Sequence, residues 1–190
     1  MSIKQVEEFE NYKIQEGSLI FGEKPAVAFG CIGTMDATSS VEKVEKKCEG
    51  AVVKTVKRVN SMTVAITGHV RIPTSRQIVG LSNEGLKTGV YGYGSNTFSM
   101  PFIFAAKIID MEGNVKYIAF PKLEDVKGLS IKVNNDVTEI EMSDLEFTAL
   151  KDSNNMFYYE MFDSESEDSE LKEAWLTNFT PDLVKQSTGE

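Results

Sequence analysis

The sequence has few of the residues on which enzymes and metal sites depend. Its 190 residues include one histidine, His69, and two cysteines, Cys31 and Cys48. A structural zinc site needs closely spaced ligand pairs, and nucleophilic catalysis needs a base placed beside the nucleophile. His69 has no acid or nucleophile near it in the sequence, so we predict no enzyme activity, no metal site and no cofactor. We expect both cysteines to be structural or incidental thiols.

Long hydrophobic runs are also missing. No apolar stretch approaches the roughly 18 residues of a membrane-spanning helix, and no basic segment followed by an apolar run marks a secretion signal. We therefore expect synthesis in the cytoplasm and no membrane partner. Hydrophobic residues make up 41% of the chain, which is enough to bury the core of one large domain.

Positive charge is scarce overall, and the net charge is −9. An acidic chain is poorly suited to gripping nucleic acid, because phosphate binding needs cationic side chains. The charges are nevertheless segregated along the sequence. A basic cluster contains Lys43, Lys46, Lys47, Lys54, Lys57 and Arg58, and an acidic cluster between Glu160 and Glu173 contains Glu165, Glu167, Asp168 and Glu170. Both clusters fit solvated surface, but they also fit two patches that meet between subunits.

Short apolar segments separated by turn residues dominate the middle of the chain. Alternation predicts half-buried strands over Met62–Val70 and Leu129–Val133, and the continuous apolar run Phe102–Ile109 predicts a strand buried on both faces. A turn at Met111–Asn114 joins this last strand to the next, Val115–Phe120. Short strands without crossover helices indicate a mostly β fold, either a β-sandwich or a partly closed β-barrel.

Two further features are expected in the second half. The apolar parity changes between Ile140 and Leu145, which predicts a β-bulge near Ser143 and Asp144. Residues 147–162 read as two strands joined by a polar turn.

One short helix is expected to flank the strands. It would begin at Pro73 and end near Leu81, with Thr74 and Gln77 forming a capping box. Between Val41 and Val59, lysine, glutamate and valine are mixed without a continuous apolar face, and Gly50 divides the stretch in two. The first part suits a helix, with Val41, Val44 and Cys48, whereas the second suits a strand, with the β-branched Val52, Val53, Val56 and Val59. We interpret this stretch as an extended pair that projects from the body, preceded by a turn-rich connection over Met35–Ser40.

These observations divide the chain into three parts. Residues 1–24 are predicted to form a loosely tethered N-terminal arm, and residues 25–162 the β domain, with a possible projecting loop at 35–50. Residues 163–190 are predicted to form an acidic linker and a C-terminal segment.

Several short motifs occur in an order and spacing that resemble the major tail proteins of long-tailed, non-contractile bacteriophages infecting Gram-positive bacteria. These motifs are Cys48-Glu49-Gly50, Thr67-Gly68-His69-Val70, Gly85-Leu86-Lys87-Thr88-Gly89-Val90-Tyr91, Ala119-Phe120-Pro121, Ala149-Leu150-Lys151-Asp152 and Phe157-Tyr158-Tyr159-Glu160. The resemblance implies a virion protein whose hexameric rings stack into the tail tube. It also implies contact with a tape measure protein and a tail terminator, and passage of phage DNA through the lumen without specific binding.

Two alternatives fit the same composition. The chain could be a β-barrel that binds a small ligand, with Phe102, Phe104, Tyr117 and Phe120 lining the cavity. It could also be another virion component, such as a tail-completion or capsid-decorating protein.

Overall fold

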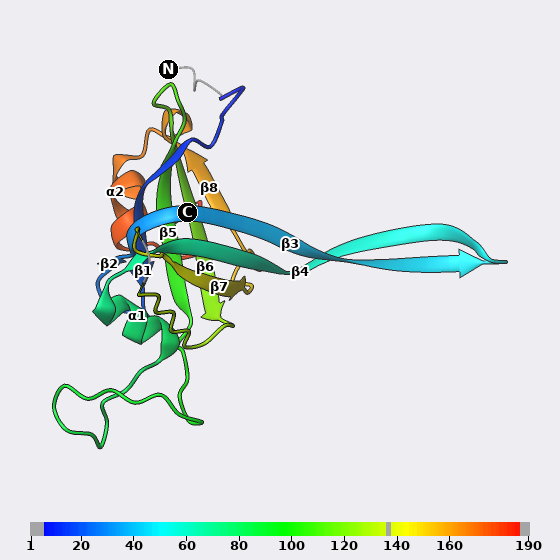
Figure 1. The fold of residues 1–190 in the computed structure, drawn as a ribbon. Coiled ribbons are helices and arrows are strands. Elements are labelled where there is room, and N and C mark those ends of the chain that lie inside the picture. The colour runs from blue at the N-terminus through cyan, green and yellow to red at the C-terminus, as the bar shows by residue number, and fades with distance from the viewer. Residues whose placement is uncertain (1–5, 136–137, 187–190) are drawn as a thin grey trace.

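A computed structural model describes residues 6–135 and 138–186, and most of its regular structure is β (Figure 1). Every strand pairing is antiparallel, and the sheet order is β2-β1-β5-β6-β7-β4-β3, with β8 pairing to β6 off this path. The predicted mostly β class is confirmed, and the sheet is not closed. The strands are β1 (Lys13–Ile20), β2 (Val27–Ala28), β3 (Gly30–Cys48), β4 (Ala51–Val70), β5 (Phe102–Ile109), β6 (Val115–Asp125), β7 (Ser143–Ala149) and β8 (Tyr159–Phe162).

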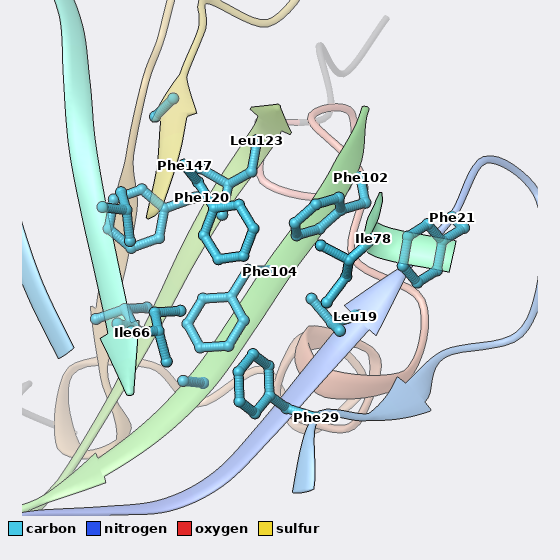
Figure 2. Packing of buried hydrophobic residues seen from close by; sticks show 14 of the residues in the cluster. Leu19, Phe21, Phe29, Ile66, Ile78, Phe102, Phe104, Phe120, Leu123 and Phe147 are labelled. Atoms are coloured by element: carbon cyan, nitrogen blue, oxygen red, sulfur yellow. The ribbon is translucent and has the colours of Figure 1, made fainter. Parts of the chain in front are cut away.

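The sheet bends so that its two halves enclose the main core. In Figure 1, β4 runs across β5 and β6, and Figure 2 shows the phenylalanine rings that fill the space between them. Phe102 and Phe147 meet edge to face with ring centroids 5.2 Å apart, and Phe104 is fully buried beside Phe120. Full burial of such a side chain contributes about 1.5–3 kcal/mol. This packing joins the two halves of the sheet through one core.

Gly30 marks the point where the chain passes from one half of the sheet to the other. β2 pairs with β1, whereas β3 begins at Gly30 and pairs with β4. The φ angle of Gly30 is +123°, and a Cβ there would lie 2.1 Å from the carbonyl oxygen of His69. Only glycine fits this crossing without displacing backbone.

A second helix covers the outer face of β1, β5 and β6. Helix α2 (Ser169–Thr177) buries Trp175, whose indole Nε1 donates to the carbonyl oxygen of Ile118 at 3.0 Å. Phe179 is also buried and meets Trp175 edge to face. Residues 163–190 were predicted to be a linker and a C-terminal segment. The prediction missed α2 because the many acids of this segment obscure the helical spacing of Leu171 and Trp175.

Of the N-terminal arm predicted over residues 1–24, residues 1–5 lie outside the described part of the chain, and residues 13–20 form a strand instead. Strand β1 begins at Lys13 and pairs with β5, and Leu19 is fully buried in the main core. The residues before Leu19 have a weak strand pattern, but burial of Leu19 and Phe21 stabilises the strand. Even Phe9 packs against the body, with its ring 5.2 Å from that of Phe162.

The expected short helix is present as α1 (Ile72–Val79), but its predicted capping box is wrong. The helix starts two residues before Thr74, which is buried inside it, and the N-cap residue Arg71 makes no side-chain capping bond. Proline is favoured in the first helical turn, so Pro73 permits this earlier start. Gly80 ends the helix with a φ angle of +75°.

Three predictions around β7 need correction. Residues 129–133 do not form a strand, and Ile131 and Val133 are 77% and 82% exposed. The β4–β7 ladder runs without a register shift, so the predicted bulge is wrong, and the parity change falls where β7 begins at Ser143. The two strands of residues 147–162 exist, but each pairs with a different part of β6.

Candidate subunit interface

The β3–β4 hairpin continues beyond the body as a two-stranded ribbon (Figure 1). β7 supports β4 only over Met62–Gly68. Residues 41–59, here called the basic hairpin, pair only with each other, and all of them are exposed. At about 3.3 Å per residue the ribbon is roughly 25–30 Å long. Residues 35–48 of the segment predicted as a loop are therefore part of β3, and residues 49–50 form the turn at its tip, so Met35–Ser40 is not a turn-rich connection.

The turn at the tip explains why two strands form here. Glu49 and Gly50 both have positive φ angles, 50° and 84°. Two-residue hairpin turns with this geometry match the twist of the flanking strands. The position of Gly50, which divides the stretch in the sequence, is the position of this turn.

The register of the basic hairpin places two valine pairs and two lysine pairs directly opposite each other, along with one opposite-charge pair, Glu42–Arg58. Directly opposed residues lie on the same face of the ribbon. Each face carries one valine pair next to one lysine pair. The pairs are Val41–Val59 with Lys43–Lys57 on one face, and Val44–Val56 with Lys46–Lys54 on the other.

This arrangement is unfavourable for an isolated ribbon. Like charges directly opposite each other destabilise a strand pair, and a two-stranded ribbon alone is marginally stable in water. The hairpin valines are 41–57% exposed, although burying apolar side chains is favourable. Within the described residues, none of the six hairpin bases forms an ion pair. Acidic groups from outside the ribbon would pair with its bases, and apolar groups would bury its valines.

The acidic cluster lies on the body, at the end of β8, in the 3₁₀ turn η1 (Asp163–Glu165) and in the first turn of α2. Some of its acids already have partners within the chain. Asp168 caps α2 by accepting from the Leu171 amide at 2.9 Å, and Glu165 accepts from the Val6 amide at 3.2 Å. Glu167 and Glu170 are exposed.

The structure does not bring the two predicted contact clusters together within one chain. Figure 1 shows α2 on the side of the body opposite to the projecting hairpin. The contact predicted between Lys43, Lys46, Lys47, Lys54, Lys57 and Arg58 and the acids Glu165, Glu167, Asp168 and Glu170 would have to join different copies, and it stays a prediction.

The cavity predicted for a small ligand is wrong. Phe102, Phe104 and Phe120 pack into the main core, where the Phe104 and Phe120 rings stack with centroids 6.4 Å apart. Tyr117 points to the opposite face of the sheet and lies against Trp175. The four aromatic residues therefore stabilise two separate cores, because alternate strand residues face opposite sides of a sheet.

The remaining sequence candidates lie on exposed strand positions. His69 is opposite Cys31 in the β3–β4 ladder, and Cys48 is opposite Ala51 at the hairpin tip. Both thiols are free and exposed. Within residues 6–135 and 138–186, no group of three or more His, Cys, Asp or Glu side chains is placed to hold a metal ion. In the same ranges, no helix has the length and hydropathy needed to cross a membrane.

Comparison of the chain with models of known protein families and with curated proteins found no match.

Proposed function

We propose that this chain is a structural subunit that self-assembles into hexameric rings, stacked as the tail tube of a long-tailed bacteriophage. One observation carries the self-assembly: the basic hairpin projects from the body with exposed valine pairs, and its lysines form no ion pair among the described residues. The hexamer, the tube and the virion location follow from the resemblance of the sequence motifs to phage major tail proteins.

The sheet geometry supports an assembly that propagates. β3 is the last strand of the sheet order, so one of its edges carries backbone groups without a ladder partner. A projecting element on one side of a subunit that docks on a different surface of the next copy makes a heterologous contact. Contacts of this type form rings when the rotation closes and stacks or filaments when it does not.

The expected partners follow from the same proposal. A tube needs a tape measure protein inside it and a terminator at its end, and phage DNA passes through its lumen. The net charge of −9 suits a lumen that does not hold DNA, because phosphates bind where cations replace their counterions.

Electron microscopy of the concentrated protein tests this function. We expect rings or tubes with a central hole, and sedimentation should show species that grow with protein concentration. The double variant Val44→Ser and Val56→Ser tests the role of the valines: it keeps the hairpin charges and should assemble less than the wild type. A wild-type chain that stays monomeric over a wide range of concentration and salt would contradict the proposal.

A further inference from the structure

The connection between β6 and β7 exposes a second apolar surface. We use the name β6–β7 connection for residues 126–135 and 138–142, which leave β6 and lead into β7. Ile131 and Ile140 are 77% and 83% exposed, and Leu129 and Met142 are also exposed. These side chains alternate with polar ones as in a strand, yet none of the described residues of the connection belongs to a strand. Such a surface is typical of an interaction site.

A groove runs beside these side chains. It encloses about 250 Å³ between residues 128–132 and 141–145, with α1 contributing Ser75 and Val79. Its apolar lining includes Leu129, Met142 and Leu145. At its rim, Lys132 forms an ion pair with Asp144 at 2.7 Å. The groove therefore combines apolar side chains with serines and charged groups.

This surface carries two exposed acids that can meet the bases of the hairpin, together with an exposed base, Lys127. Glu139 and Glu141 are exposed, and neither forms an ion pair among the described residues. The nearby Lys132 is already paired with Asp144. Two glutamates beside exposed isoleucines thus complement lysine pairs beside exposed valine pairs.

The acidic cluster of residues 160–173 offers acids to the hairpin lysines but no apolar surface to the hairpin valines. It has exposed acids, but no large hydrophobic side chain is exposed among the described residues after Met156. A hairpin docked there would gain ion pairs, yet its valines would stay in water. Burial of apolar area is the larger favourable term in most associations, so the β6–β7 connection is the better acceptor.

We propose that the β6–β7 connection is the surface on which the basic hairpin of a second copy docks. The hairpin docks with one face: its Val44–Val56 pair covers Leu129, Ile131 and Ile140, and its Lys46–Lys54 pair meets Glu139 and Glu141. This inference rests on the proposed self-assembly and names the acceptor surface within it. Because donor and acceptor are different surfaces of the same chain, each docked copy presents a new hairpin to the next.

Charge exchange in the full-length chain tests the acceptor. The hairpin variant carries Lys46→Glu and Lys54→Glu, and the acceptor variant carries Glu139→Lys and Glu141→Lys. We expect each to associate about tenfold more slowly than the wild type. Association should return when the four substitutions are combined in one chain, or when the two variants are mixed. Sedimentation measures association, and thermal unfolding checks that each variant folds.

The matched control moves the same charges in the acidic cluster. Glu165→Lys with Glu167→Lys should leave association unchanged and should not rescue the hairpin variant. Rescue by this pair, or wild-type association of the acceptor variant, overturns the inference while rings and tubes still support the proposed function. If the exchange pattern holds but microscopy shows no rings or tubes, the tube function falls and the docking surface stands. Wild-type chains that never associate overturn both.

Discussion

Lys43 of β3 lies directly opposite Lys57 of β4, on one face of a ribbon whose residues are all exposed. A second lysine pair, Lys46–Lys54, repeats this opposition on the other face. Each such pair destabilises the ribbon by a few tenths of a kcal/mol, up to about 1 kcal/mol. The hairpin therefore has a charge arrangement that suits association with an acidic surface better than it suits the isolated chain.

Replacing Lys57 with glutamate should separate the stability of the free hairpin from its ability to associate. Lys57→Glu creates an opposite-charge pair with Lys43, so the hairpin amides should become better protected from hydrogen exchange in the free subunit. The same change should slow assembly, because it lowers the positive charge that steers the hairpin toward an acidic surface. Lys87→Glu, at an exposed loop position, is the control of equal charge change. Faster assembly of Lys57→Glu would contradict this prediction.

Assembly should change the protection of the hairpin backbone. In the free subunit, amides of residues 41–59 should exchange faster than those of β5 and β6, because only one ladder holds them and every residue is exposed. In the assembled state their exchange should slow markedly. The measurement is hydrogen exchange with mass spectrometry on both states. Equal exchange in both states would remove the hairpin from the interface.

Trp175 should be essential for the stability of the body. Its side chain is 2% exposed, and its indole donates to the carbonyl oxygen of Ile118. Trp175→Ala should lower the free energy of unfolding by about 3–5 kcal/mol, measured by urea denaturation. Trp175→Phe keeps much of the apolar area and should cost less. Wild-type stability of the alanine variant would show that α2 is not part of the cooperative core.

Asp110 should make the stability depend on pH in the acid range. Burial raises the pKa of its carboxyl, but hydrogen bonds from the Asn114 side chain and from the Asn114, Glu112 and Gly113 amides outweigh burial, so the pKa lies below its ordinary value. A lowered pKa stabilises the fold above the unfolded value of about 3.9, and this stability is lost as the pH falls through the folded pKa.

Asp110→Asn should therefore lower Tm near neutral pH and flatten the decline of Tm below about pH 4. Glu112→Gln, at the exposed neighbouring position, serves as the control. An acid decline of Tm that is as steep in Asp110→Asn as in the wild type would assign the pH dependence to other carboxylates.

Local pattern was sufficient for those parts of the fold whose partners are near in sequence. The alternating residues Met62–Val70 lie in β4, and the apolar run Phe102–Ile109 is β5. The predicted turn after this run joins β5 to its partner β6. Gly50 formed the tip of the basic hairpin because a tight turn needs positive φ there. The charge clusters could also be predicted, since they depend only on the order of residues along the chain.

The tertiary structure decided where equivalent patterns ended up. Residues 129–133 alternate as clearly as a strand, but they stay unpaired because β7 joins β6 only near Leu123–Asp125. Phe104 and Tyr117, both aromatic and both on central strands, entered two different cores on opposite faces of the sheet. The sequence by itself determined which segments can form strands, because that depends on local backbone and side-chain chemistry. Only long-range pairing determined which of them are buried, which project, and which keep apolar side chains exposed.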